Sequence, residues 1–351
     1  MQSDILKEYG FTDGPLTVES FGTGLINHTW KVNYEDNYYI LQRINDNVFK
    51  QPADITSNIG LLAHYLQQQH PDYFFVAPVK TTNGMEMVYL KDKGYFRMFP
   101  FVNGSHSKDV LETPGEAYEA AAQFGKFTKL LDGIPIDELK ISIPDFHNLS
   151  LRYQQFLTAQ KKGNPRRIKE TEDLTIELLN HAAIVTEYKN IITNSKFKQR
   201  VTHHDTKISN VLFDDAGKGL CVIDLDTVMP GYFISDVGDM MRTYLSPVSE
   251  EEKDFSKIII REEFYEAIVN GYYNEMKDVL TETEKHYFFY AGTFMIYMQA
   301  IRFLTDYLND DKYYGSVYRG QNLVRAGNQT VLLQRLLEKK EKLIEIIKES
   351  N

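Results

Sequence analysis

The sequence contains very little cysteine. Cys221, inside an apolar run, is the single cysteine among 351 residues. One thiol excludes a disulfide framework within the chain and argues against a cysteine-based metal site, so we expect reducing, cytoplasmic conditions. The N-terminal stretch MQSDILKEYGF lacks the basic start and the apolar core of a signal peptide. No stretch approaches about 18 apolar residues, so we also expect no membrane-spanning helix.

The sequence also lacks an excess of positive charge. Its formal net charge is −10. This charge argues against nucleic acid or an anionic membrane as the main partner, because both bind basic surfaces. A small anion could still bind to a local cluster of donors. With 42% apolar and 13% aromatic residues, the chain can bury a sizeable core.

The first hundred residues are rich in strand-forming residues. These residues alternate with Gly, Asn and Asp, which predicts strands at 16–21, 29–34 and 38–44. The stretch PADITSNIGLLAHYLQQQH has apolar residues at helical spacing and predicts a helix. A further hairpin is predicted around 92–94.

From Thr113 onward the pattern becomes helical. Thr113 stands where an N-cap is expected, Pro114 follows at the first helical position, and Gly133 lies after the end. Further helical periodicity covers about 149–162, 168–193, 255–278, 283–308 and 328–349. The last segment is amphipathic, and we expect it to pack on its own domain rather than form a coiled coil. We therefore predict an α+β protein with a strand-rich N-terminal lobe (1–102) and a mainly helical C-terminal lobe (103–351).

One stretch inside the helical part is different in character. VTHHDTKISNVLFDDAGKGLCVIDLDTVMPG, residues 201–231, predicts short strands at 211–213 and 220–225. Taken singly, Asp224 and Asp226 could be solvated residues that close a strand.

Their neighbours favour a shared site. Asp205 and Asn210 flank a short loop, so both side chains can converge on one point, and Asp224 ends an apolar run that should be buried. Two acids and an amide, with no His or Cys pattern for zinc, form the ligand set of a hard cation such as Mg²⁺.

The pattern HxDxxxxN, followed by IDLD, resembles the catalytic and metal-binding loops of the aminoglycoside phosphotransferase and choline kinase family. Members of this family are small-molecule relatives of protein kinases. The resemblance implies a protein-kinase-like, two-lobed fold and the transfer of a phosphoryl group from ATP with the help of Mg²⁺.

The resemblance also implies roles for single residues. Asp205 would accept the proton of the attacking hydroxyl and contact the substrate, and Asn210 and Asp224 would hold Mg²⁺ on the triphosphate. Lys207, two residues after the base, would neutralise charge that builds up on the transferred group. Asp226 would support the site or touch the substrate.

The same resemblance predicts a nucleotide site in the N-terminal lobe. Gly22 and Gly24 would belong to a phosphate-covering loop, although the third glycine of the protein-kinase pattern is missing. The third strand, YYILQRIN, has no Lys where protein kinases place one. Arg43 is the predicted phosphate contact and Gln42 the alternative, because a shift by one residue exchanges the faces of a strand.

Two further segments match the family. FRMFPFVNG, residues 96–104, resembles the hinge strand, with backbone groups near Phe99 and Phe101 facing adenine; a plain edge strand is the alternative. In YFISDVGDMMRT, Asp236 would brace the catalytic loop by hydrogen bonds, and His203 would orient the backbone of that loop.

For the substrate, several segments between about residues 20 and 330 resemble the N-acetylhexosamine 1-kinases. That resemblance implies transfer to the anomeric hydroxyl of GlcNAc or GalNAc, with Arg302, Asp306 and Tyr313 in the sugar pocket. An ordinary salt bridge between Arg302 and Asp306 is the alternative, since the two are four residues apart on a helix. The rival functions are a kinase of another alcohol (homoserine, methylthioribose, choline or an aminoglycoside) and a pseudokinase-like nucleotide-binding module.

Overall fold

The computed structural model describes residues 2–12, 14–22 and 26–350. Backbone contacts divide the chain into two compact units. The first unit consists of Met1–Ser107, Leu130–Pro144 and Asn210–Pro230, and the second of Lys108–Lys129, Asp145–Ser209 and Gly231–Asn351. Each unit thus combines segments that are distant in sequence, and the predicted division after residue 102 stays a prediction. Of the helices in the described ranges, none has both the length and the apolar composition that a membrane span requires.

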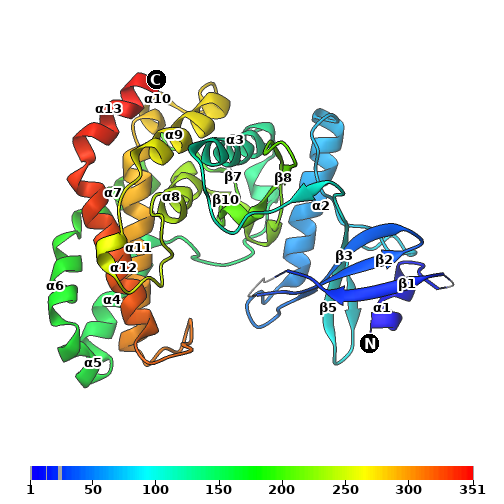
Figure 1. Cartoon of the computed structure of the whole chain (residues 1–351), viewed down its shortest axis with the longest axis horizontal. Helices are drawn as coiled ribbons and strands as arrows, with labels where there is room; N and C mark the ends of the chain where they lie inside the picture. The colour runs from blue at the N-terminus through cyan, green and yellow to red at the C-terminus, as the bar shows by residue number, and fades with distance from the viewer. Residues whose placement is uncertain (1, 13, 23–25, 351) are drawn as a thin grey trace. The chain divides into compact units, whose positions relative to one another are not determined.

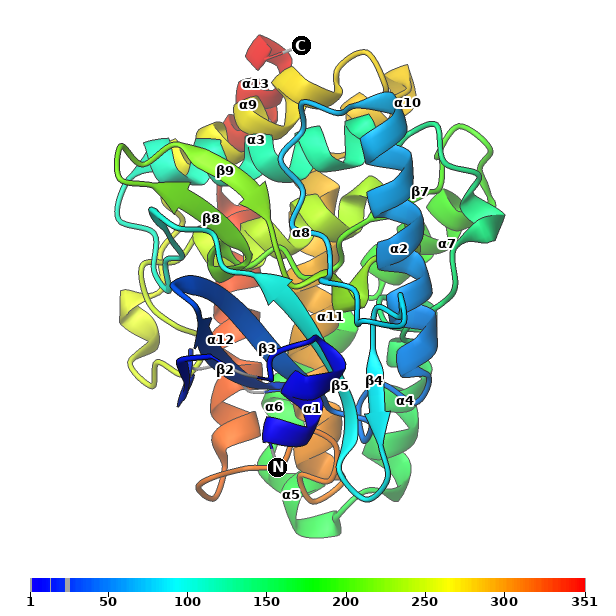
Figure 2. The same cartoon turned by 90° about the vertical axis from the view of Figure 1, so that its right-hand side faces the viewer.

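The first unit is built on a five-stranded antiparallel sheet with the order β1-β2-β3-β5-β4 (Figure 2). The strands are β1 Leu16–Ser20, β2 His28–Tyr34, β3 Asn37–Ile44, β4 Val88–Leu90 and β5 Gly94–Pro100. The three strands predicted from the first half of this region are confirmed to within one residue at each end. Glu35 and Asp36, with φ of 48° and 63°, form the tight turn between β2 and β3.

The two faces of this sheet carry different side chains. Successive residues of a strand point to opposite faces. Leu41 is fully buried in the core that α1 (Gln2–Glu8) helps to form, and Figure 1 shows this helix in blue beside the sheet. Arg43 lies two residues along from Leu41 and shares its face. Gln42 and Arg97, which oppose each other in register, lie on the other face.

The first unit also contains α2 (Pro52–Gln69), where the sequence predicts a helix, and a second sheet with the order β6-β8-β9. The three strands are β6 Ser105–His106, β8 Val211–Asp214 and β9 Gly219–Val222. β9 ends three residues before the predicted end at 225. The reason is local: Asp224 adopts a left-handed backbone with φ 60°, and Leu225–Thr227 form a 3-10 turn, η3.

The second unit is organised around α11 (Phe288–Leu308), which is buried on nearly every side. It packs against α4 (Leu149–Lys162), α8 (Phe233–Tyr244) and α12 (Gln321–Glu338) (Figure 1). At Gly238 of α8, an added Cβ would come within 2.3 Å of the carbonyl oxygen of an α11 residue. Only glycine therefore allows the two helices to pack this closely.

Helix α3 (Pro114–Leu130) begins where the sequence predicts, after Thr113. The Thr113 hydroxyl accepts a hydrogen bond from the Glu116 amide (3.3 Å), and the Glu116 carboxylate accepts one from the Thr113 amide (3.2 Å). This reciprocal pair is a capping box, which satisfies amides that the first helical turn leaves unpaired.

The remaining elements are α5 Pro165–Glu170, α6 Glu172–Asn180, α7 Ala183–Thr193, β7 Arg200–Thr202, β10 Met229–Gly231, α9 Glu262–Met276, α10 Glu282–Lys285, α13 Lys340–Ser350, and the 3-10 turns η1 Ile136–Glu138, η2 Ile208–Asn210 and η4 Phe255–Lys257. The long helix predicted at 168–193 is thus three shorter ones, because Thr171 (φ −114°, ψ 19°) and His181 (φ −95°, ψ 14°) leave helical geometry. Helix α8 is an element that the sequence analysis missed.

The predicted terminal helix is also interrupted, at Lys339 between α12 and α13. Leu343 and Ile347 of α13 are buried, and α13 packs against α9 and α11 of the same unit. The expectation that this segment packs on its own domain is confirmed.

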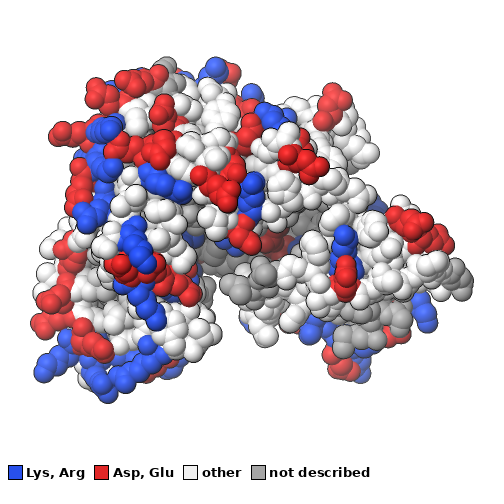
Figure 3. Space-filling view, in the orientation of Figure 1, with Lys and Arg blue, Asp and Glu red and all other residues white. Residues whose placement is uncertain are grey.

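Charged side chains of opposite sign are interspersed on the face of the molecule shown in Figure 3. Glu262 at the start of α9 pairs with both Lys339 and Lys342, which links α13 to α9. Exposed pairs of this kind contribute little singly, so the apolar contacts of α13 provide most of its attachment.

Candidate active site

Carboxylates of α8 bind backbone amides of the loop that follows β7. The amide of His203 donates to Oδ2 of Asp236 (3.0 Å), and the amide of His204 donates to Oδ1 (2.7 Å). All three residues are buried, and His204 has a left-handed φ of 67°. The expectation that Asp236 braces this loop by hydrogen bonds is confirmed.

A second carboxylate on α8 holds the next part of the loop. The amide of Thr206 donates to Oδ2 of Asp239 (2.9 Å), and the Tyr244 hydroxyl donates to the carbonyl of Thr206 (2.6 Å). Asp239 is itself paired with Arg242 at 3.0 Å. The sequence analysis did not assign these residues. The repeat of Asp236 and Asp239 three residues apart, on one helix face, is the signal that could have found them.

Burial governs the electrostatics of this support. It raises the pKa of Asp236 to about 7; the amides of His203 and His204 oppose the rise, and the Asp239 carboxylate adds to it. Burial also raises the pKa of Asp239. For Arg242, burial favours a lower pKa, but the carboxylates of Asp239 and Glu250 outweigh it and raise the pKa, so this guanidinium remains charged.

The start of the loop is fixed by a buried ion pair. Arg200 of β7 donates through Nη1 and Nη2 to the two carboxylate oxygens of Glu284, at 2.8 and 2.9 Å. Glu284 also accepts from the amides of Lys198 (2.9 Å) and Thr281 (2.8 Å), so both of its oxygens are satisfied. A fork-to-fork pair of this kind fixes direction as well as distance.

Asp205 and Lys207, the predicted base and its cation, lie together on the loop that follows β7. Lys207 Nζ is 3.1 Å from Oδ2 of Asp205, and about half of the Lys207 side chain is exposed. The fully buried His203 accepts from the Asp205 amide through Nδ1 (3.3 Å), and its ring meets those of Phe124 and Phe127 edge-on. This setting fits the predicted role of His203 in orienting the backbone.

Asn210 and Asp224, the predicted metal ligands, lie at one end of the β8–β9 hairpin. Val211 pairs with Val222, and the next rung is the bond from the Ile223 amide to the Asn210 carbonyl (2.9 Å). An amide and a carboxylate are thereby brought to the same strand end. These oxygen donors suit Mg²⁺, which typically takes one or two protein ligands and phosphate oxygens. Among the described residues, no group of three or more His, Cys, Asp or Glu side chains could hold a metal ion by itself.

Asp226, a predicted substrate residue, is buried in the first unit. It forms an ion pair with Arg97 of β5, and both side chains are almost fully buried. Arg97 Nε and Nη2 also donate to Oε1 of Gln42, at 3.1 and 3.0 Å. Sequence reasoning assigned no role to Arg97; it lies 129 positions before Asp226 (226 − 97), so no local pattern relates the two.

The carboxylate of Asp226 also accepts a hydrogen bond from the loop before β2. Asn27 Nδ2 donates to Oδ2 of Asp226 (2.7 Å), and Asn27 Oδ1 accepts from the amide of Asn45 (3.0 Å). Gly22 of the predicted Gly-rich loop has φ +75°, a conformation that favours glycine. Gly24 lies outside the described residues.

The predicted hinge is the end of β5 and the residues after it. The amide of Phe101 donates to the carbonyl of Tyr38 (2.9 Å), so this amide is occupied by the sheet. The Phe101 ring meets that of Phe21 edge-on, at 5.9 Å, and has the ammonium of Lys31 4.1 Å from its centroid. Phe99 lies 5.1 Å from the Arg97 guanidinium.

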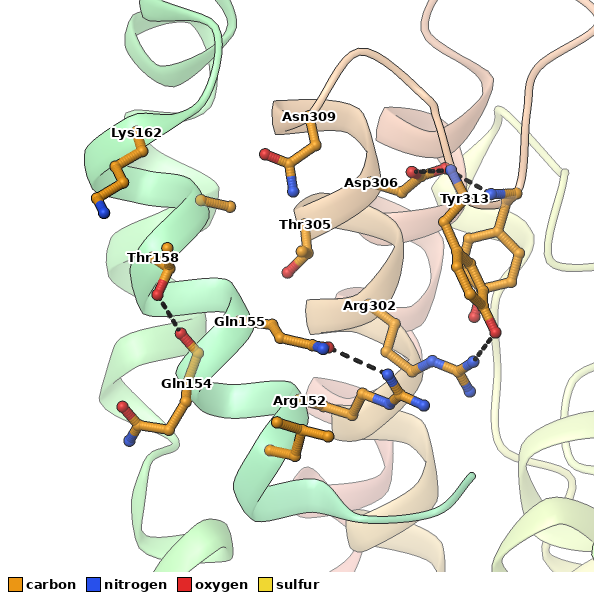
Figure 4. A pocket seen from close by; sticks show the side chains of 13 residues that line it. Arg152, Gln154, Gln155, Thr158, Lys162, Arg302, Thr305, Asp306, Asn309 and Tyr313 are labelled. Atoms are coloured by element: carbon orange, nitrogen blue, oxygen red, sulfur yellow. Dashed lines mark hydrogen bonds between the residues drawn. The ribbon is translucent and has the colours of Figure 1, made fainter. Parts of the chain in front are cut away.

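The second unit has a pocket of about 560 Å³ between α4 and α11 (Figure 4). Arg152 and Gln155 of α4 and Arg302 of α11 line it, together with Asp306 and Tyr313. In Figure 4 the guanidinium groups of Arg152 and Arg302 lie at the same end of the pocket. The three predicted sugar residues are therefore brought together.

Within this pocket Arg302 and Asp306 make different bonds from the salt bridge that their spacing suggests. Arg302 donates to Gln299 (2.9 Å) and to the Tyr313 hydroxyl (3.4 Å). Asp306 accepts from the amides of Tyr313 (2.7 Å) and Tyr314 (2.9 Å), so its carboxylate holds the loop after α11 in place.

Contacts within the second unit connect the pocket to the loop that follows β7. The Arg302 guanidinium lies 5.9 Å from the ring of Phe146, which stacks on His147 at 4.5 Å. His147 Nδ1 is 3.2 Å from His204 Nδ1. Burial, followed by the charges of His204 and Arg302, holds the pKa of His147 well below its usual range, so this ring is neutral.

Comparison with known proteins gives one family match. A model of the family described as "Phosphotransferase enzyme family" matches residues 17–279. This range runs from the second residue of β1 through β10 and includes the loop that follows β7 and helix α8.

Several solved structures share the fold. A microcompartment-associated aminopropanol kinase has a TM-score of 0.68 at 15% identity, with 97% of each chain covered. The amicoumacin kinase bound to AMP-PNP and Ca²⁺ has a TM-score of 0.62 at 14% identity, covering 95% of this chain and 93% of that one. An aminoglycoside phosphotransferase from Alicyclobacillus acidocaldarius has a TM-score of 0.59 at 15% identity, with 97% of each chain covered. The fold is therefore the protein-kinase-like α+β fold that the sequence predicts.

Proposed function

The chain belongs to the phosphotransferase enzyme family, and on this basis we propose that it is an ATP- and Mg²⁺-dependent kinase of a small-molecule alcohol. For the acceptor we propose the anomeric hydroxyl of an N-acetylhexosamine, GlcNAc or GalNAc, which would give the sugar 1-phosphate. The amicoumacin kinase structure contains a nucleotide analogue, AMP-PNP, and a divalent cation, Ca²⁺, which supports the choice of cofactors.

The proposed phosphoryl transfer depends on residues of the loop that follows β7. Asp205 would accept the proton of the attacking hydroxyl, and Lys207 would neutralise charge that develops on the transferred group. Because Asp236 holds the two residues before Asp205 by their amides, the base would need little reorganisation to act. Asn210 and Asp224 would hold Mg²⁺, which when bound would offset the charge of the triphosphate.

The nucleotide would be held by the first unit. Gly22 and Gly24 would cover the phosphates, and the chain around Phe99 and Phe101 would face adenine. The Phe101 amide would not take part in this contact, because it already donates to the carbonyl of Tyr38.

The choice of acceptor is carried by one observation, the composition of the pocket between α4 and α11. Arg152 and Arg302 bring two positive charges into it, and Gln155 brings an amide. The carboxylate of Asp306 is occupied by backbone amides. Such a lining repels a polycationic aminoglycoside or choline and suits a neutral molecule rich in hydroxyl and amide oxygens.

Tyr313 would complete the sugar pocket. Its side chain is about two-thirds exposed, and its hydroxyl is 3.4 Å from Arg302, so an aromatic face and a guanidinium are available together. Aromatic faces stack on sugar rings, and arginine donors match paired oxygen atoms. Asp306 would position this loop rather than touch the sugar, and Asp226 would support the site from within the first unit.

The test is a coupled assay of ADP release with ATP and Mg²⁺ against GlcNAc, GalNAc, choline, homoserine and kanamycin. We expect turnover only with the N-acetylhexosamines and the sugar 1-phosphate as product. Turnover on another alcohol alone would replace the acceptor and keep the reaction. Asp205→Asn should abolish turnover and spare ATP binding, while Asp215→Asn, at an exposed turn, serves as the control. Full activity of Asp205→Asn would refute the assignment of the base.

A further inference from the structure

The face of the sheet that Asp226 contacts carries a cation, Arg97, which comes from β5 and not from the third strand, β3. β3 has one basic residue, Arg43, and it lies on the face that shares the core with α1. Gln42, on the opposite face, stands in register with Arg97 of β5. The guanidinium of Arg97 reaches over Gln42, which accepts from its Nε and Nη2. The neighbouring strand thus supplies a positive charge at the place where the third strand has a neutral amide.

The donors of Arg97 are only partly used. Arginine has five N–H groups and no acceptor. Nε and Nη2 bind Gln42, and Nη2 also faces the carboxylate of Asp226. Nη1 is buried and, among the residues that the structure describes, has no hydrogen-bond partner. A buried charged group with unused donors is costly unless a ligand satisfies them.

The partners of Arg97 place it among the elements proposed to hold phosphate and metal. Asp226 is two residues from Asp224, the proposed metal ligand, and it also binds Asn27 from the loop before β2. The other cation on this face, Lys31, has its ammonium over the rings of Tyr38 and Phe101. Arg97 is therefore the cation that pairs directly with Asp226, the carboxylate that the loop before β2 also contacts through Asn27.

We propose that Arg97, through Nη1, binds the phosphate groups of the nucleotide and so takes the place of the missing lysine of the third strand. This inference rests on the proposed function in one respect, that the ligand is a nucleoside triphosphate. Arg97 stays paired with Asp226 while it does so, because Nη2 serves the carboxylate and Nη1 the phosphate. The pair thereby links phosphate binding to the position of the metal-binding loop.

The experiment measures the affinity of the full-length protein for ATP and for adenosine by titration calorimetry. Single removal of Arg97 would leave Asp226 as an unpaired buried charge, so the main variant is Arg97→Gln combined with Asp226→Asn. Asp226→Asn alone is its reference. We expect the double variant to bind ATP at least about tenfold more weakly than its reference, the value of one charged hydrogen bond, and to bind adenosine equally well.

Two further variants complete the design. Lys80→Gln removes an exposed charge of the first unit and should leave the ratio of the two affinities unchanged. Arg43→Gln tests the rival assignment. A selective loss of ATP affinity in Arg43→Gln, without one in the Arg97 variant, would overturn the inference, and so would an equal loss for ATP and adenosine in the Arg97 variant.

The outcome separates this inference from the proposed function. A wild-type protein that binds ATP but phosphorylates no alcohol would defeat the proposed function, while the ratio of ATP to adenosine affinity would still decide the role of Arg97. A wild-type protein that binds ATP no more tightly than adenosine would overturn the inference even if phosphoryl transfer were observed at high ATP concentration.

Discussion

The hydrogen bonds that Asp236 accepts from the loop that follows β7 give a prediction whose size can be worked out. Asp236→Ala removes the acceptor of two buried amides, those of His203 and His204. Each buried donor left unsatisfied costs about 1–3 kcal/mol, or about 2–6 kcal/mol together. Burial raises the pKa of Asp236, so its removal also relieves a desolvation cost. We therefore expect a net loss of about 2–3 kcal/mol in the free energy of unfolding.

The chain offers a matched control for this prediction. Asp214 also accepts from two backbone amides, those of Ala216 and Lys218, both at 2.9 Å, but in an exposed turn. Water can replace its carboxylate there, so Asp214→Ala should cost less than about 1 kcal/mol. Urea unfolding gives the stabilities, and kcat for phosphoryl transfer should fall in Asp236→Ala alone. Equal losses of stability in the two variants, or an unchanged kcat in Asp236→Ala, would refute the reasoning.

Three further predictions follow from buried groups. Burial raises the pKa of Asp236 from 3.8 to about 7, so the folded state holds a proton that the unfolded state has released, and the contribution of this group to stability falls as pH rises from about 4 to 7. The difference in urea midpoint between wild type and Asp236→Asn should fall across this range. A difference that does not change with pH would contradict the prediction. Arg200→Ala should cost about 3–5 kcal/mol, because Glu284 is left buried and unpaired, and Arg200→Ala with Glu284→Gln should recover part of it in the same assay. Asn322→Ala removes a donor to Asp306 (3.1 Å) and should raise KM for the acceptor more than it lowers kcat; an unchanged KM would show that this loop does not shape the pocket.

Local signals allowed much of the fold to be predicted. The alternation of strand-forming residues with turn residues identified β2 and β3 to within one residue, because a two-residue turn fixes both the ends and the register of a hairpin. Thr113, followed by Pro114 and Glu116, marked the start of α3, because capping is decided by residues adjacent in sequence. The bracing role of Asp236 was predicted from the family resemblance, and its hydrogen bonds confirm it.

Other features depend on contacts that no local pattern carries. Helix α8 was missed because its polar face, which carries Asp236 and Asp239, is buried against the loop that follows β7 instead of facing solvent. The pairs Arg97–Asp226 and Asp306–Asn322 form between separate elements and exist only once the chain has folded. In each case the acid had been noticed in the sequence, and the fold supplied its partner.

The burial of the single cysteine gives this protein an intrinsic probe of its own opening. Cys221 lies in β9, on the hairpin that ends at the proposed metal ligands, and only 1% of it is exposed. Burial raises the pKa of its thiol from 9.0 to about 12, so its reactive thiolate is about a thousandfold scarcer at neutral pH than in an exposed cysteine. A thiol reagent can therefore modify the chain at an appreciable rate only when this hairpin separates from its surroundings. The rate of that modification measures how often the first unit opens in the native protein, with no label introduced and no residue changed.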